Sequence, residues 1–202
     1  MPMWLSFQRD WFLSVNHFAR YTPLLHAPFE VYAKYGVALF AAALLLSWWL
    51  ARRESPRVMA AALWAPVGTL VAVGLNQPLV GHFHEARPYT LFPHALLLVS
   101  RSQDFAFPSD HAVMAGAVAA GVLLAHRRLG TLTAVAAVLM AFTRVYVGVH
   151  LPLDVVVGLL FGAAVTTLGY LLFHRPIAAL VARLSRTAIG PLLTRAHPVD
   201  AG

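Results

Sequence analysis

Five apolar stretches constrain the fold of this chain more than any other feature of its sequence. Each is close to the ~20 residues that a helix needs to cross the hydrocarbon core of a bilayer. In lipid, a helix also pairs its own backbone polar groups. The sequence therefore predicts an all-α, polytopic transmembrane helix bundle of about five spans, at about 31–50, 57–80, 109–126, 129–147 and 152–173.

The composition fits one membrane domain. Of the 202 residues, 59% are hydrophobic and 11% are charged, whereas a soluble domain carries about 25% charged residues. We expect residues 1–202 to form a single integral membrane domain. The absence of cysteine excludes disulfides and thiol nucleophiles. The net charge of +7 comes from basic residues that flank the apolar stretches, which favours membrane anchoring over nucleic-acid binding.

Segments outside the spans have their own patterns. Residues 3–20 mix aromatic and polar side chains and are too polar to span, which predicts an N-terminal interfacial helix within an interfacial region, 1–30. The apolar segment 95–99 is too short to cross and is expected to dip into the interface. The sequence His174-Arg175-Pro176 predicts that the last span ends near Phe173, before a basic cytoplasmic tail at 177–202.

Three polar segments lie at the ends of the apolar runs: HEARPY (84–89), FPSDHA (107–112) and TRVYVGVHLPLD (143–154). Because successive spans alternate in direction, all three fall on one side of the membrane. Ionisable residues at membrane boundaries are costly and commonly functional. The segments together therefore predict one functional site.

The distribution of basic residues predicts which side that is. Cytoplasmic loops carry an excess of Lys and Arg. Of the 15 basic residues, 9 lie opposite the three polar segments: Arg52, Arg53, Arg57, Arg127, Arg128, Arg175, Arg183, Arg186 and Arg195. The site is therefore expected on the extracytoplasmic face.

The last polar segment contains a histidine and a carboxylate at helical spacing. Pro152 suits the first turn of a helix, so His150 lies at the mouth of the last span with Asp154 about one turn below. A carboxylate there can fix the tautomer and leave Nε2 free to attack phosphorus. The alternative is a structural pair, a histidine at a helix end beside a buried aspartate.

The middle polar segment has the features of a phosphate site. Pro108 blocks a helix from extending backwards, and Ser109 is a good N-cap. The helix then presents free amides and its positive dipole end. Ser109 could donate its hydroxyl, and His111 could act as general acid. Asp110 would repel a phosphate and is expected to point aside. Plain helix capping remains the alternative.

Arg87 and Arg144 supply guanidinium groups suited to phosphate oxygens. Either one alone could be an interfacial arginine whose guanidinium group extends into the aqueous phase. Taken together with His150, Asp154 and His111, they complete the requirements of phosphoryl transfer through a phosphohistidine.

The spacing of these residues resembles a known family. R-x5-H-x3-D (Arg144, His150, Asp154), P-S-x-H (108–111) and R-P (87–88) are similar to the three signature motifs of the type 2 phosphatidic acid phosphatase superfamily. The resemblance implies that His150 is the nucleophile, Asp154 its orienting partner and His111 the general acid. It further implies phosphate binding by Arg87, Ser109 and Arg144, with no metal or other cofactor.

The chain departs from the family pattern at three positions. Val80 stands where the first motif normally has a lysine, Asp110 replaces a glycine and Thr143 replaces a serine. Another cation is then expected to take the place of the lysine, and the candidates are His84, His82 and Lys34. His82 and His84 could instead be ordinary interfacial residues, or could bind a metal together with Glu85.

The forms FPSDH, AKYG (33–36) and VGVHLPLD look most like bacterial undecaprenyl-diphosphate phosphatases of the bacitracin-resistance type. This resemblance implies a multi-pass protein of the bacterial plasma membrane that hydrolyses undecaprenyl diphosphate to undecaprenyl phosphate. An isoprenoid or glycerolipid phosphate is the expected partner. The alternatives are a phosphatidic acid or phosphatidylglycerophosphate phosphatase, a lipid phosphotransferase, or a non-enzymatic lipid-binding or transporter-like protein.

Overall fold

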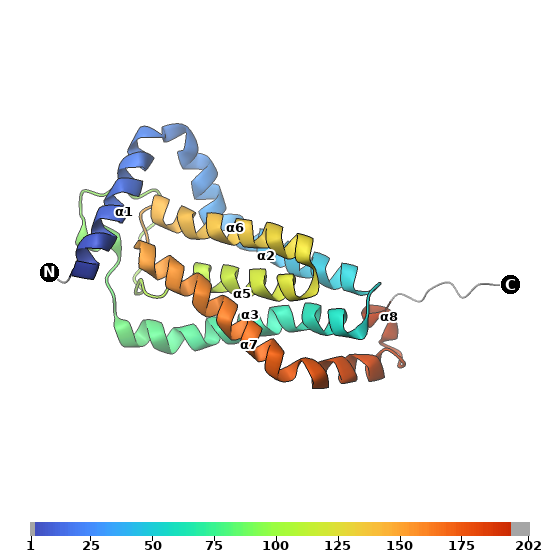
Figure 1. Cartoon of the computed structure of the whole chain (residues 1–202). Helices are drawn as coiled ribbons and strands as arrows, with labels where there is room; N and C mark the ends of the chain where they lie inside the picture. Colours follow the sequence, from blue (N-terminus) through green and yellow to red (C-terminus); the bar gives the residue numbers. More distant parts are fainter. Residues whose placement is uncertain (1–2, 195–202) are drawn as a thin grey trace.

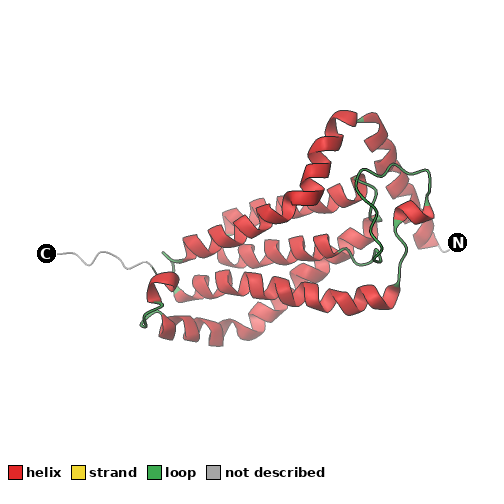
Figure 2. Cartoon of the chain, turned by 180° about the vertical axis from the view of Figure 1, so that it is seen from behind, coloured by secondary structure: helices red, strands yellow, loops and turns green. Residues whose placement is uncertain are grey.

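The computed structural model describes residues 3–194, and within that range the chain forms helices and loops without strands (Figures 1 and 2). The predicted tail beyond residue 194 lies outside the described residues. The elements are α1 (Met3–Tyr21), the 3-10 helix η1 (Pro23–Leu25), α2 (His26–Ala51), α3 (Pro56–Phe83), α4 (Pro88–Leu91), α5 (Asp110–Ala125), α6 (Arg127–Tyr146), α7 (Pro152–Leu184) and α8 (Gly190–Leu193).

Five helices run side by side as a bundle, which confirms the predicted fold class (Figure 1). Within residues 3–194, four segments are long and apolar enough to cross a membrane: 23–51, 56–91, 127–146 and 152–184. The fifth helix of the bundle, α5, is shorter, with 16 residues, and lies at the centre between α3, α6 and α7. Its central position explains why most of its residues are buried.

Glycines bring the backbones of α5 and α7 into contact. A Cβ atom on Gly162 of α7 would meet the carbonyl of Val113, and one on Gly116 of α5 would meet the carbonyl of Leu159. Small residues permit such close helix approach within membranes. At the start of both helices, the Ser109 amide donates a hydrogen bond to the Asp154 carbonyl (3.0 Å). The N-terminal ends of α5 and α7 are thus held together.

Helix α7 continues past its predicted end near Phe173 to Leu184, and it changes direction in its C-terminal half (Figure 1). Pro176 lies inside the helix instead of ending it. Proline is tolerated within membrane helices because neighbouring groups satisfy the freed backbone, and it commonly bends them. Val181 of α7 and Leu193 of α8 are buried in one cluster. Part of the predicted tail, 177–202, therefore packs on the bundle.

Helix α1 runs across one end of the bundle (Figure 1). The helix predicted at 3–20 is therefore present. Its location in the membrane interface stays a prediction. Two buried polar side chains attach it. Gln8 Oε1 accepts a hydrogen bond from the Leu153 amide (3.3 Å) in the first turn of α7. Asn16 donates to the Leu96 carbonyl (2.8 Å) and accepts from the Leu96 amide (2.9 Å), which binds α1 to the segment 95–99.

Candidate active site

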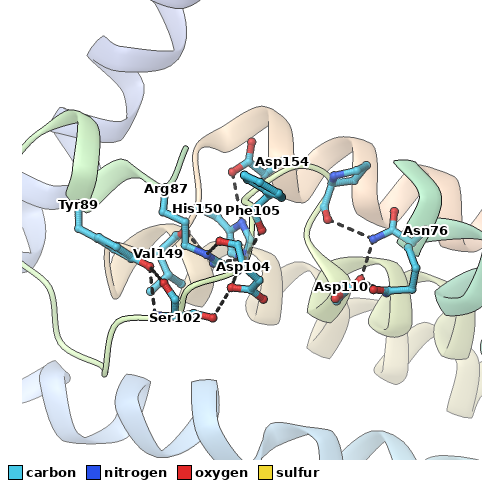
Figure 3. A network of polar contacts seen from close by, with 12 residues as sticks. Asn76, Arg87, Tyr89, Ser102, Asp104, Phe105, Asp110, Val149, His150 and Asp154 are labelled. Atoms are coloured by element: carbon cyan, nitrogen blue, oxygen red, sulfur yellow. Dashed lines mark hydrogen bonds and ion pairs between the residues drawn. The ribbon is translucent and has the colours of Figure 1, made fainter. Parts of the chain in front are cut away.

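The three polar segments meet at the end of the bundle that α1 crosses (Figures 1 and 3). Arg87 precedes α4, Ser109 precedes α5, Arg144 lies in the last turn of α6, and His150 lies between α6 and α7. A cavity of about 470 Å³ opens here. Its lining residues are Glu30, Ala33, Lys34, Arg87, Leu98, Val99, Ser100, Ser102, His111, Arg144 and Val149.

His150 and Asp154 form a buried pair at the base of this region. His150 is 2% exposed and Asp154 is 0% exposed. The Nδ1 atom of His150 lies 3.2 Å from Asp154 Oδ2, which also accepts the Leu151 amide (2.8 Å). On its other side, His150 Nε2 lies 3.2 Å from Arg87 Nη1. Arginine has only donors, so Nε2 accepts, and the proton is assigned to Nδ1, facing Asp154.

The surroundings of His150 keep its ring neutral. Burial lowers the pKa of His150 well below its ordinary value of 6.5, and the nearby positive charges of Arg144 and Arg87 lower it further. A neutral imidazole with its proton on Nδ1 has its electron pair on Nε2. The arrangement therefore provides a nucleophile whose tautomer and orientation are fixed by Asp154.

The start of α5 provides hydrogen-bond donors near this nucleophile. The amides of its first turn have no partner within the helix. The hydroxyl of Ser109 is buried without a hydrogen-bond partner among the described residues. His111, in the first turn, lies on the cavity wall. An anion placed there would meet the positive end of the helix.

Asp110 points away from the pair formed by His150 and Asp154 (Figure 3). Its Oδ1 accepts hydrogen bonds from Asn76 (2.7 Å) and Gln77 (3.0 Å) of α3, as expected for a carboxylate kept away from phosphate. Asn76 also donates to the Pro108 carbonyl (3.1 Å). Asn76 was not predicted from the sequence, although an amide inside an apolar span is a signal that points to it.

Arg144 and Arg87 both contribute to the cavity wall. Arg144 donates weakly to the Ala33 carbonyl (3.4 Å), and its Nε atom is buried without a partner among the described residues. Arg87 is buried, at 7% exposure, and forms an ion pair with Asp104 (2.8 Å). The two guanidinium groups thus differ, because Arg87 is firmly paired and Arg144 has donors to spare.

The three candidates for the missing cation lie in different places. Lys34 of α2 is on the cavity wall. His84 ends α3 in a left-handed conformation (φ 51°), with its ring 4.5 Å from the ring of Phe105. His82 and His84 are exposed and are not among the residues that line the cavity. Lys34 is therefore the candidate that the fold brings to the same cavity as Arg87 and Arg144.

The alternative of a metal site receives no support from the geometry. No group of three His, Asp or Glu side chains comes together as a metal-binding cluster anywhere in residues 3–194. The triplet of His82, His84 and Glu85 accordingly does not converge, although the three are close in sequence.

Comparison with known proteins shows the family of this chain. Residues 61–178, more than half of the chain, match the PAP2 superfamily. The bacitracin transport permease protein BcrC of Bacillus licheniformis is 30% identical over 154 residues, covering 76% of this chain and 74% of that protein. The undecaprenyl-diphosphatase BcrC of Bacillus subtilis (strain 168) is 26% identical over 200 residues, covering 94% and 96%.

A solved structure shares the fold. The first transmembrane PAP2 type phosphatidylglycerolphosphate phosphatase from Bacillus subtilis superposes with a TM-score of 0.61 at 20% identity, over 88% of each chain. Residues 61–178, which match the family, contain all three polar segments and most of the helices from α3 to α7. The chain therefore belongs to the PAP2 superfamily, as its motifs predicted.

Proposed function

We propose that this protein is a membrane lipid phosphatase that hydrolyses undecaprenyl diphosphate to undecaprenyl phosphate through a phosphohistidine. The observation that carries the proposal is the buried His150, whose Nδ1 atom lies 3.2 Å from Asp154 Oδ2, beside a cavity lined by Arg87 and Arg144. The name of the Bacillus subtilis relative, undecaprenyl-diphosphatase BcrC, supports the choice of substrate. Both relatives come from bacteria.

The reaction proceeds in two displacements. His150 Nε2 attacks the terminal phosphorus, the bond from phosphorus to the bridging oxygen breaks, and undecaprenyl phosphate leaves with a proton from His111. Water then attacks the phosphorus of the phosphohistidine and gives a proton to His111. The bond from phosphorus to His150 Nε2 breaks, and inorganic phosphate is released. Asp154 stabilises the positive charge that develops on the His150 ring in both steps.

Charge on the transferred phosphoryl group is stabilised by groups that are already in place. Arg144 and Lys34 line the cavity, as does His111 in the first turn of α5. The buried hydroxyl of Ser109, two residues before His111, has no hydrogen-bond partner among the described residues. Such preorganised donors contribute most where charge develops in the transition state. They supply the charge neutralisation that a divalent cation provides in other phosphatases.

The test is phosphate release by purified protein from a panel of lipid phosphates. We expect undecaprenyl diphosphate to be hydrolysed with EDTA present, and orthovanadate to inhibit as a mimic of the trigonal-bipyramidal transition state. Phosphatidic acid and phosphatidylglycerophosphate are the comparison substrates, and a lipid acceptor reports transfer. Loss of activity in EDTA with recovery on adding zinc or magnesium would contradict the metal-free route.

We further propose that the site faces the outside of the bacterial plasma membrane. The turn between α2 and α3 carries Arg52 and Arg53, and Arg127 begins α6, all at the end of the bundle opposite His150 (Figure 1). This excess of basic residues is typical of cytoplasmic loops.

Cysteine labelling checks the orientation, because the chain contains no cysteine of its own. We expect His94→Cys, in the exposed loop at the site end, to react in intact cells with a membrane-impermeant thiol reagent. Glu54→Cys, in the turn at the opposite end, should react only after the cells are permeabilised. The reverse pattern would place the site in the cytoplasm.

A further inference from the structure

Every N–H group of Arg87 is already engaged by the protein. Its Nε donates to the Asp104 carbonyl (3.2 Å), and its Nη1 donates to the Val149 carbonyl (3.1 Å) and to His150 Nε2 (3.2 Å). Its Nη2 donates to Asp104 Oδ1 (2.8 Å) and to the Phe105 carbonyl (3.2 Å). A guanidinium group has five N–H donors, so Arg87 has none left for a phosphate.

The five acceptors fall into two kinds. Three are backbone carbonyls, which hold the plane of the guanidinium group in position. The other two are the side chains of His150 and Asp104 (Figure 3). A side chain can leave by rotation, whereas a carbonyl leaves only if the chain moves. A phosphate that reaches Arg87 is therefore expected to take the two N–H groups that face His150 and Asp104.

Asp104 is suited to leave. Its side chain is 57% exposed, whereas that of Arg87 is 8% exposed. It lies in the irregular segment between α4 and α5. Burial works against its charge, but hydrogen bonding by Ser102 and the charge and hydrogen bond of Arg87 hold the pKa of Asp104 below its usual 3.8. Asp104 is thus an anion at neutral pH.

A second set of contacts holds Asp104 on Arg87. The hydroxyl of Ser102 hydrogen-bonds Asp104 Oδ1. Tyr89 in turn fixes the backbone of Ser102, since its hydroxyl donates to the Ser102 carbonyl (2.6 Å) and accepts the Ser102 amide (3.1 Å). A continuous chain of polar contacts therefore runs from Tyr89 through Ser102, Asp104 and Arg87 to the nucleophile (Figure 3).

We propose that Asp104 is an internal competitor of the substrate phosphate, occupying a guanidinium N–H of Arg87 until a phosphoryl group displaces it. The inference rests on the proposed phosphatase function. The same exchange redirects the N–H that Arg87 gives to His150 Nε2, so phosphate binding uncovers the electron pair of the nucleophile. An anion must therefore bind Arg87 more strongly than Asp104 does before the electron pair of His150 is released.

If Asp104 competes with phosphate for Arg87, removal of its charge should strengthen anion binding. When only part of a population can bind, the apparent dissociation constant is the intrinsic value divided by the competent fraction. An ion pair with one exposed partner is worth up to about 1 kcal/mol. Asp104→Asn, which keeps the shape but removes the charge, should therefore bind orthovanadate and inorganic phosphate about three- to fivefold more tightly than the wild type.

The experiment measures binding of orthovanadate and inorganic phosphate by calorimetry to the full-length protein in detergent, together with the Michaelis constant. Asp104→Asn and Ser102→Ala should both strengthen binding, the second by less. Asp10→Asn is the matched control, because Asp10 is an exposed aspartate of α1 at the same end of the bundle. It removes the same charge and should leave binding within twofold of the wild type.

Weaker or unchanged anion binding in folded Asp104→Asn would overturn the inference, because a residue that merely orients Arg87 raises the dissociation constant when it is lost. Asp104→Ala provides a second variant with the same expected sign. Since the binding assay needs no lipid, it is independent of the proposed substrate. If undecaprenyl diphosphate is not hydrolysed but the variants bind anions more tightly, the substrate assignment fails and the role of Asp104 stands.

Discussion

Replacing His150 with alanine is expected to lower the rate of phosphate release by a factor on the order of 10⁴ or more. The physical reason is that the covalent route needs the Nε2 electron pair, which Asp154 and Arg87 hold in position. The measurement is turnover of undecaprenyl diphosphate by the purified variant, with its melting temperature in detergent as the control for folding. Appreciable turnover by folded His150→Ala would show that another group attacks phosphorus.

The companion variant Asp154→Asn keeps the volume but removes the negative charge and disturbs the tautomer. A residual rate should remain, about 10²- to 10⁴-fold below the wild type, because His150 is still present.

The wild-type pH profile gives a further check. Only neutral His150 can attack, and burial together with Arg144 and Arg87 lowers its pKa. Protonation of His150 should therefore lower the activity only below pH 6.5. A loss of activity with its midpoint at pH 6.5, the ordinary pKa of histidine, would contradict this expectation.

Replacing Lys34 with glutamine is expected to raise the Michaelis constant and the inhibition constant for vanadate roughly tenfold, with a smaller effect on kcat. A dianionic phosphate between Arg87 and Arg144 gains from a third positive charge in a partly dry site. Lys34 supplies that charge from the cavity wall. Inhibition by vanadate, measured across salt concentrations, separates this electrostatic effect from a loss of packing.

Two variants complete the test of Lys34. Lys34→Arg keeps the charge and should retain most of the affinity. His84→Gln removes the histidine closest to Arg87 in sequence, and it should change neither constant, since His84 is exposed beside Phe105 and outside the cavity lining. A large effect of His84→Gln with none from Lys34→Gln would reverse the assignment.

Much of this fold follows from local properties of the sequence. The lengths of the apolar runs determine a helical membrane bundle, because lipid leaves the backbone no other way to pair its polar groups in an isolated segment. Pro108 and Pro152 determine where α5 and α7 begin, since the first stops the helix from extending backwards and the second suits a first turn. Alternation of the spans then brings the three motifs to one end.

Other features could be decided only by tertiary contacts. Pro176 predicts a helix end, yet α7 continues because packing around Val181 favours the bent helix. The polar residues Gln8 and Asn16 suggest a water-facing surface, yet they seat α1 on the bundle through hydrogen bonds to residues distant in sequence.

The features of the candidate site also fall into those that the sequence determines and those that depend on tertiary contacts. The sequence by itself determined His150 and Asp154 as a pair, because residues four apart near a helix start are neighbours, and it provided the candidates for phosphate binding. It could not determine that Lys34 reaches the cavity while His84 does not, or that Asp104 occupies Arg87. Those facts depend on how whole helices are rotated and on the course of the loop between α4 and α5. Neither has a local signal in the sequence, so only the tertiary structure decided them.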